Sequence, residues 1–168
     1  MASIIALTGF MGCGKTTVGQ ELARRIAWNF IDLDEMIEEV SGMGIPDIFA
    51  CEGEEGFRAR ELRALRELIQ NQRETVIALG GGTLTQPAAA ELVKGKATVV
   101  YLEIDAKEAW QRVFDSGRPL ARELEQFIPL LESRRPIYEK IADITVSASL
   151  VNPKEIAQQI LDLIMQGK

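Results

Sequence analysis

Short apolar runs alternate with amphipathic stretches along this chain. The apolar runs have the length and boundaries of buried strands, and they read SIIALT, NFIDLD, TVIAL, ATVVYLEI and DITVSA. Helical spacing predicts helices over 15–27, from Met36 to Val40, from GIPDIF onward, over 54–70, 106–114 and 124–131, and from Pro153. Strands separated by helices favour right-handed crossovers and a parallel sheet covered on both faces. Ligands of such α/β folds bind at the carboxyl ends of the strands.

Length and composition narrow the class of protein. The 168 residues suit a single domain, and 46% hydrophobic and 26% charged residues are ordinary for a soluble globular protein. No apolar run is long enough to cross a bilayer and no secretion signal is present, so a cytoplasmic location without membrane contact is expected. The two cysteines, Cys13 and Cys51, form no C-x-x-C pair, which indicates a reducing compartment and no zinc site.

Charge and histidine content exclude several functions. A formal net charge of −6 argues against binding to nucleic acid, and an anionic ligand would need a local basic cluster. The chain contains no histidine, which excludes Ser-His-Asp triads, Cys-His pairs and histidine metal ligands. A general base is therefore expected to be a carboxylate.

The stretch GFMGCGKTT lies between the first predicted strand and the first predicted helix. Its spacing, Gly9-x-x-x-x-Gly14-Lys15-Thr16, is that of a loop whose backbone N–H groups surround phosphates at the positive end of a helix. Lys15 is expected to reach the β- and γ-phosphates of a nucleotide, and the Thr16 hydroxyl to ligate Mg²⁺. The alternative is a chance glycine turn, but the strand before and the helix after favour the phosphate loop.

Asp32 and Asp34 end the second predicted strand. Residues two apart on a strand point to the same side, so both carboxylates are expected to face the phosphate loop. One would hold the metal through water, and the other would accept a proton from an acceptor hydroxyl. The alternative is helix capping, because Asp32 with Glu35 three residues later resembles a capping box.

Arg58 continues the apolar face that Leu62, Leu65 and Ile69 form on the helix predicted over 54–70. An arginine on the buried side of a helix needs a partner. Glu61, beside it, can be that partner for structural reasons alone, or it can orient Arg58 toward a ligand carboxylate. The residues by themselves favour neither interpretation.

Three further features lie at a strand end or in loops. The triple glycine at 80–82 would let a ligand approach the backbone closely, although a flexible turn explains it equally well. Arg118 would close over transferring phosphoryl oxygens from a moving loop, or it is a solvated loop arginine. Arg134 and Arg135 form a basic pair that would bind an anion or face water.

Several segments together resemble the shikimate kinase family: GFMGCGKTTVG, FIDLDEMIE, FRARE, LGGGT, RPLA and RRPIY have that family's order and approximate spacing over nearly the whole chain. The resemblance implies a P-loop α/β fold like that of nucleoside monophosphate kinases, with a five-stranded parallel sheet. It implies one kinase domain over 1–168, with a helical substrate-binding region at about 34–62 and a short lid at about 115–125. The implied reaction transfers the γ-phosphoryl group of ATP to the 3-hydroxyl of shikimate with Mg²⁺, in aromatic amino-acid biosynthesis, and a monomer is expected.

The resemblance also implies roles for individual residues. The catalytic ones would be Lys15, Asp34 as base, and Arg118 in the lid. The metal would be served by Thr16 and Asp32. Shikimate would contact Asp34, Arg58, Gly80, Gly81, Gly82 and Arg134, the last fitting the family's R-x-P-x-Y pattern. ATP would contact Gly12, Cys13, Gly14, Lys15, Thr16, Thr17, Arg112, Arg118 and Pro153, with Arg112 and Pro153 flanking adenine. Leu150 and Val151 replace basic residues of the family, so weaker adenine contacts are expected.

Other functions remain open on the residues alone. Arg58 and Arg134 indicate only an anionic acceptor, so a kinase of another small polyhydroxy acid, such as gluconate, is one alternative. A non-catalytic ATP-binding relative is another, but such a protein is expected to lose Asp34 or Arg118, and this chain keeps both. A GTPase switch would carry an N-K-x-D-like stretch, which is absent.

Overall fold

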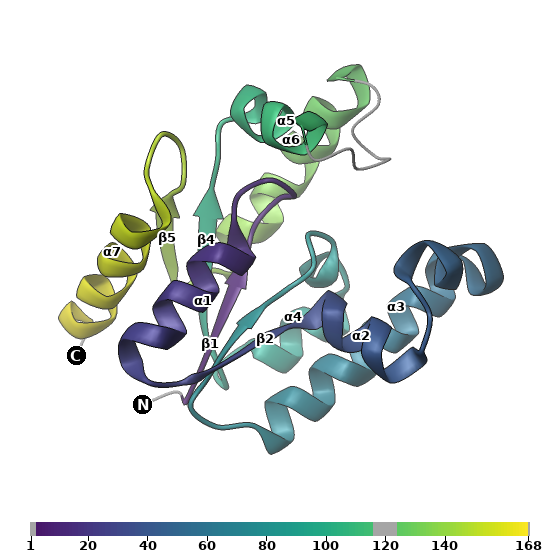
Figure 1. Ribbon diagram of the computed structural model, residues 1–168, viewed down its shortest axis with the longest axis horizontal. Helices are drawn as coiled ribbons and strands as arrows, with labels where there is room; N and C mark the ends of the chain where they lie inside the picture. The colour runs from purple at the N-terminus through teal and green to yellow at the C-terminus, as the bar shows by residue number, and fades with distance from the viewer. Residues whose placement is uncertain (1–2, 116–123, 168) are drawn as a thin grey trace.

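Over residues 3–115 and 124–167, which the computed structural model describes, five parallel strands form one sheet in the order β2-β3-β1-β4-β5 (Figure 1). The strands are β1 (Ile4–Thr8), β2 (Asn29–Asp32), β3 (Thr75–Ala78), β4 (Thr98–Glu103) and β5 (Ile144–Ser147). The helices are α1 (Lys15–Ile26), α2 (Leu33–Ser41), α3 (Ile45–Asn71), the 3₁₀ helix η1 (Thr83–Thr85), α4 (Pro87–Val93), α5 (Ala106–Asp115), α6 (Leu124–Ile141) and α7 (Pro153–Gln166). The predicted α/β class and parallel sheet are confirmed.

The core lies on both faces of the sheet. Strand β1 is buried at every position because its side chains alternate between two cores. Ile5 and Leu7 pack with α1 and α7, whereas Ile4 and Ala6 pack with α3 and α4. Figure 1 shows these helix pairs on opposite sides of the sheet, with α5 and α6 at its carboxyl end.

Strand order decides where loops meet. Strand β1 lies between β3 and β4, with Leu7 in register with Ala78 on one side and Val100 on the other. The loops that follow these three strands therefore emerge side by side at the carboxyl edge of the sheet. This is the position at which α/β sheets bind their ligands.

Strand β2 is shorter than predicted. It ends at Asp32, whose carboxylate oxygen Oδ1 accepts hydrogen bonds from the backbone N–H groups of Asp34 and Glu35 and so caps α2. Asp34 therefore lies in the first turn of a helix. The prediction that Asp32 and Asp34 project together from one strand is wrong, because the capping interaction ends the strand before the second aspartate.

The helices also differ in part from the prediction. The helical piece predicted to begin at GIPDIF and the helix predicted over 54–70 join into α3 across a kink at Gly53, where φ is 70°. Helix α6 runs on to Ile141 through Pro129 and Pro136, whereas a helix ending at 131 was predicted. Tyr138 lies in the extension and is buried like Phe127 and Leu131 before it, and this burial outweighs the backbone hydrogen bonds lost at the prolines. Helix α4 and η1 were not predicted.

Two further expectations concern the lid and the membrane. Most of the predicted lid, with Arg118, lies outside the described residues. Among the described helices, none combines the length and apolar character needed to cross a membrane.

Candidate active site

The phosphate loop closes tightly between β1 and α1. Gly9, Gly12 and Gly14 have φ values of 145°, 85° and 89°, in the region that favours glycine. A β-carbon at Gly9 would lie 2.7 Å from the carbonyl oxygen of Leu102, and one at Gly12 would lie 2.8 Å from that of Ala109. All three glycines are thus favoured by backbone conformation, and Gly9 and Gly12 are also required by the close packing of β4 and α5.

Lys15 lies over this loop. Its ammonium group donates hydrogen bonds to the carbonyl oxygens of Gly9 at 2.7 Å and Phe10 at 3.2 Å. The Cys13 thiol is buried and its sulfur lies 3.6 Å from Lys15 Nζ. The predicted cation therefore lies at the phosphate loop, at the N-terminal end of α1, where an anion is favoured.

Thr16 and Asp32 meet across the start of α1 and the end of β2. The Thr16 hydroxyl donates to Asp32 Oδ2 at 2.7 Å, while the other carboxylate oxygen caps α2. The capping interpretation of Asp32 is thus confirmed, and its role toward a metal stays a prediction. A hydroxyl and a carboxylate beside a phosphate loop suit nucleotide-bound Mg²⁺, which takes few protein oxygens and keeps phosphate and water as its other ligands. In the described part of the chain, no group of three or more carboxylate or cysteine side chains forms a separate metal site.

Four charged side chains converge on the triple glycine after β3: Asp34, Arg58, Glu61 and Arg134. A β-carbon at Gly80 would lie 3.1 Å from Asp34 Oδ1, and one at Gly82 would lie 2.3 Å from Arg58 Nη2. A β-carbon at Gly81 would lie 3.6 Å from both Arg134 Nη1 and the backbone nitrogen of Met11, the latter in the phosphate loop. The glycine segment therefore joins the phosphate loop to side chains from α2, α3 and α6.

Arg58 is held on α3 by a buried carboxylate. Its Nη1 donates to Glu61 Oε1 at 2.7 Å, and Glu61 is 0% exposed. Glu61 also accepts hydrogen bonds from the Thr83 hydroxyl on Oε2 and from the Gln86 amide on Oε1, both at 2.7 Å. A buried carboxylate with an arginine and two neutral donors is fully paired. Helix periodicity correctly predicted the contact between Arg58 and Glu61.

The neighbouring residues Arg134 and Arg135 of helix α6 have different surroundings. Arg134 lies over the ring of Phe10 in the phosphate loop, with its guanidinium carbon 5.6 Å from the ring centre. Arg135 instead forms ion pairs with Glu103 and Glu132, at 3.3 Å and 3.2 Å. The hydrogen bonds that Arg135 donates to Glu132 raise the pKa of Arg135. Arg134 therefore lies beside the phosphate loop, and its role toward an anionic ligand stays a prediction.

Tyr138 connects α6 to the glycine segment. Its hydroxyl donates to the carbonyl oxygen of Gly81, and its ring lies 5.1 Å from that of Tyr101. Burial raises the pKa of Tyr138 above its ordinary value, and burial likewise raises the pKa of Tyr101 to about 12. The Tyr138 hydroxyl therefore stays protonated, and remains a donor, at any physiological pH.

Arg112 connects α5 to two loops on the nucleotide side. It donates to the carbonyl oxygens of Gly12 at 3.1 Å and Ala148 at 3.3 Å, and it pairs with Glu108. Glu108 in turn accepts from the backbone N–H of Leu150, a residue with φ 56° and 95% exposure. Arg112 thus ties the phosphate loop to the segment before α7, where Pro153 is the first helical residue.

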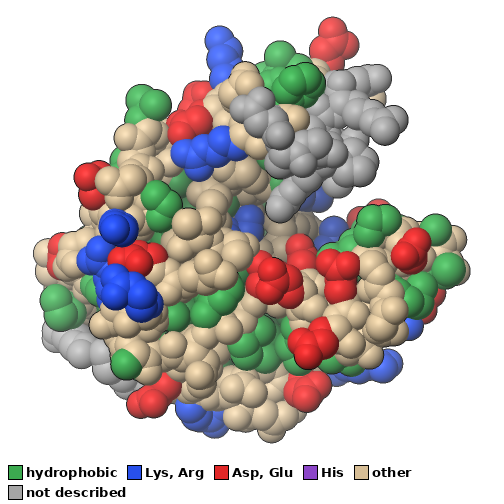
Figure 2. Space-filling model, in the orientation of Figure 1, with side chains coloured by type: hydrophobic (Ala, Val, Ile, Leu, Met, Phe, Trp, Pro, Cys, Tyr) green, Lys and Arg blue, Asp and Glu red, His purple; other side chains and the backbone are tan. Residues whose placement is uncertain are grey.

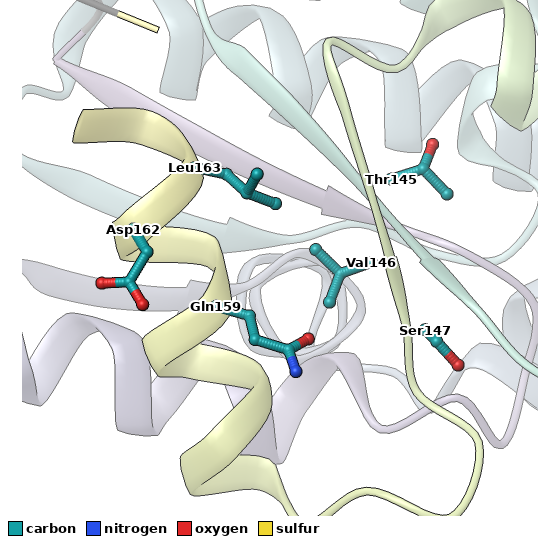
Figure 3. Close-up of a pocket in the computed structure, with 6 residues that line it drawn as sticks. All are labelled: Thr145, Val146, Ser147, Gln159, Asp162 and Leu163. Atoms are coloured by element: carbon teal, nitrogen blue, oxygen red, sulfur yellow. The ribbon is translucent and has the colours of Figure 1, made fainter. Parts of the chain in front are cut away.

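Of two surface hollows, one is lined by predicted site residues and the other is not. One of about 570 Å³ is lined by Thr17, Gln20, Glu21, Arg24, Asn152, Pro153 and Lys154, and so includes two predicted ATP contacts. The other, of about 350 Å³, lies between β5 and α7 and contains none of the predicted site residues (Figure 3). Figure 2 shows the molecule also hollowed between its α5–α6 end and its α2–α3 end, with acidic and basic side chains at the hollow.

Sequence reasoning missed Thr83, Gln86, Tyr138 and Glu108 as parts of this site. The Thr83 and Gln86 contacts with Glu61 join positions 22 and 25 residues apart, beyond any helical period. Tyr138 served only as a landmark of the R-x-P-x-Y pattern. Its position one turn after Arg134 on the same helix face was the signal that could have indicated a contact at the glycine segment.

Comparisons with known proteins agree with this geometry. The family model described as shikimate kinase matches residues 11–165. Shikimate kinase from Haemophilus influenzae strain Rd is 41% identical over 165 residues, covering 95% of this chain and 91% of that protein. The structure of shikimate kinase from Acinetobacter baumannii in complex with shikimate has a TM-score of 0.94 and 39% identity, and covers 100% of this chain and 96% of that one.

A second solved structure gives the same result. Shikimate kinase from Aquifex aeolicus has a TM-score of 0.86 and 38% identity, and covers 98% of this chain and 96% of that one. The predicted P-loop fold of the nucleoside monophosphate kinase type is confirmed by these neighbours. With a family match over most of its length and relatives above 30% identity, this chain belongs to the shikimate kinase family.

Proposed function

We propose that this protein is an ATP-dependent kinase that phosphorylates the 3-hydroxyl of shikimate and so produces shikimate 3-phosphate. The observation that carries the proposal is the convergence of Asp34, Arg58 and Arg134 on a glycine segment that touches the phosphate loop. Two guanidinium groups suit the carboxylate of the acceptor, and one aspartate suits its hydroxyls. The phosphate loop next to them places the phosphoryl donor beside the acceptor.

The donor side binds the nucleotide. The backbone N–H groups of the phosphate loop and the Lys15 ammonium group bind the phosphates of ATP, and Lys15 follows the γ-phosphoryl group as it moves. Arg112 and Pro153 flank adenine, and Pro153 lines the same hollow as Thr17. Thr16 and Asp32 hold Mg²⁺, which neutralises charge on the β- and γ-phosphates when bound.

The acceptor side aligns one hydroxyl with the γ-phosphorus. Arg58 and Arg134 bind the shikimate carboxylate, and the glycine segment lets the ring approach the backbone. The 3-hydroxyl oxygen then forms a bond to the γ-phosphorus while the bond to the β,γ-bridging oxygen breaks and ADP leaves. Asp34 accepts the hydroxyl proton. The chain contains no histidine that could take this role instead.

Arg118 completes the proposal on the donor side. The resemblance assigns it to a lid that closes over the transferring phosphoryl group, and its position lies outside the described residues. We further place the protein in the cytoplasm and propose that it acts as a monomer.

The test is an acceptor panel in an assay that couples ADP release to NADH oxidation. The purified protein is given MgATP with shikimate, quinate, gluconate or a nucleoside monophosphate. We expect kcat/KM for shikimate to exceed that for every other acceptor by more than about a hundredfold, or about 2.7 kcal/mol. A preference for gluconate would show that the acceptor is another polyhydroxy acid and not shikimate. ADP release that no acceptor stimulates would indicate a non-catalytic or ATPase relative.

A further inference from the structure

The Glu61 carboxylate has more partners than an ion pair with Arg58 requires. Arg58 and Gln86 both donate to Oε1, and the Thr83 hydroxyl donates to Oε2. Thr83 and Glu61 are both 0% exposed, so water does not compete for these contacts. Both neutral donors come from the segment directly after the triple glycine.

We propose that Thr83, supported by Gln86, is a positioning residue that keeps Glu61 from taking both edges of the Arg58 guanidinium. Arg58 is then held at one nitrogen and keeps its other edge for the carboxylate of the acceptor. This inference rests on the proposed function, because it concerns how Arg58 binds shikimate.

The geometry of the arginine supports this role. Arginine and carboxylate groups tend to pair through two parallel hydrogen bonds. Within the described residues, Arg58 donates to Glu61 only through Nη1, and its Nη2 lies over Gly82, where a β-carbon would be 2.3 Å away. To grip both nitrogens, Glu61 would have to turn Oε2 away from Thr83 and leave the buried hydroxyl without its acceptor.

The remaining acidic neighbour of Arg58 does not block the free edge. Glu54 lies 3.7 Å from Arg58 Nε, and its side chain is 72% exposed. An exposed carboxylate at this distance is held weakly and yields to a ligand carboxylate. The buried network around Glu61, rather than the exposed pair, therefore fixes where Arg58 points.

The experiment compares substitutions that alter one hydroxyl. Thr83→Val keeps the shape of the side chain and removes the donor, whereas Thr83→Ser keeps the donor. Thr75→Val is the matched control, because Thr75 is also 0% exposed and its hydroxyl donates to a carbonyl oxygen, but at the opposite end of β3. Shikimate and ATP dissociation constants are measured by calorimetry, and unfolding temperatures by differential scanning calorimetry.

We expect Thr83→Val to weaken shikimate binding by about tenfold, which corresponds to about 1.4 kcal/mol. ATP binding is expected to stay within about twofold, and Thr83→Ser and Thr75→Val are expected to bind shikimate within about twofold of the wild type. Gln86→Leu is expected to show a smaller loss in the same direction. A general structural defect would instead weaken both ligands in Thr83→Val and in the Thr75→Val control alike, and would overturn the inference.

A double-mutant cycle separates this inference from the proposed function. If Thr83 acts through Arg58, then Thr83→Val in an Arg58→Ala background changes shikimate affinity by less than about twofold. A strong loss in Arg58→Ala with wild-type affinity in Thr83→Val overturns the inference and leaves the proposed function standing. Wild-type shikimate affinity in Arg58→Ala overturns both the assignment of Arg58 and this inference.

Discussion

Gly82→Ala is expected to remove shikimate binding without damaging the fold. Gly82 has φ −100° and ψ −1°, which any residue adopts, so alanine causes no backbone strain there. The new β-carbon would nevertheless lie 2.3 Å from Arg58 Nη2 and 2.9 Å from the guanidinium carbon. Since the obstructing atoms are the far end of a flexible side chain, Arg58 moves and the backbone stays.

The size of the effect follows from what Arg58 would lose. A guanidinium displaced by about 1 Å or more no longer offers two parallel donors to a carboxylate. The loss of such a partly buried, charge-assisted contact costs about 2–4 kcal/mol, or about 30-fold to 1,000-fold in affinity. Replacing glycine by alanine in a compatible conformation stabilises the fold by about 0.4–1 kcal/mol. Displacing the guanidinium also weakens the buried Arg58–Glu61 pair, because Arg58 Nη1 would lie 2.9 Å from the new β-carbon. This loss works against the gain from alanine, so stability should change much less than shikimate binding.

The assay pairs calorimetric titration of shikimate with thermal unfolding. Gly167→Ala is the matched control, because Gly167 has φ −75° and ψ 2° and a β-carbon there meets only an ordinary contact at 3.6 Å. We expect Gly82→Ala to lose shikimate affinity while its unfolding temperature stays close to that of the wild type. Unchanged shikimate affinity would refute the placement of Arg58 at the acceptor, and a large drop in unfolding temperature would refute the steric reasoning.

Three further predictions concern the proposed chemistry and the buried tyrosine. Lys15→Met should lower kcat by more than about a hundredfold with an unchanged unfolding temperature, because a charge that follows the γ-phosphoryl group is lost; residual activity within about tenfold of the wild type would contradict this role. Asp34→Asn should lower kcat by about 10²–10⁴-fold with only a moderate loss of ATP affinity, and an acidic limb that persists in its pH–rate profile would show that another group titrates. The raised pKa of Tyr138 means that the folded state retains its proton above pH 10.0, where the unfolded state releases it. Stability should therefore be constant through neutral pH and fall as pH rises above about 10, and thermal unfolding of Tyr138→Phe should show a smaller alkaline loss.

Local patterns predicted much of this fold. The five strands follow from apolar runs that need both faces of a sheet buried, as the alternation of Ile4 to Leu7 between two cores illustrates. The phosphate loop follows from glycines whose positive φ values leave little choice of residue. Arg58 and Glu61 lie three residues apart on one helix, so the period of the helix was enough to bring them together.

Local patterns could not predict contacts between segments that lie far apart in the sequence. At Asp32, helix capping competes with extension of the strand. The strand ends there because the Asp32 carboxylate accepts hydrogen bonds from two backbone N–H groups of α2. Helix α6 continues past two prolines because tertiary burial overrides local propensity. The pairing of Thr83 and Gln86 with Glu61 depends on the sheet order that places the end of β3 beside α3. No single stretch of sequence contains that information.

The most direct test of the proposed reaction is the phosphorus NMR spectrum of the product. Wild-type protein is incubated with MgATP and shikimate, and phosphorus-31 and proton spectra are recorded over time. The proposal predicts one new phosphate monoester whose phosphorus couples to the proton on carbon 3 of shikimate, formed in equal amount with ADP. Inorganic phosphate as the only new phosphorus signal besides those of ADP, or a phosphate on any other hydroxyl, would contradict it.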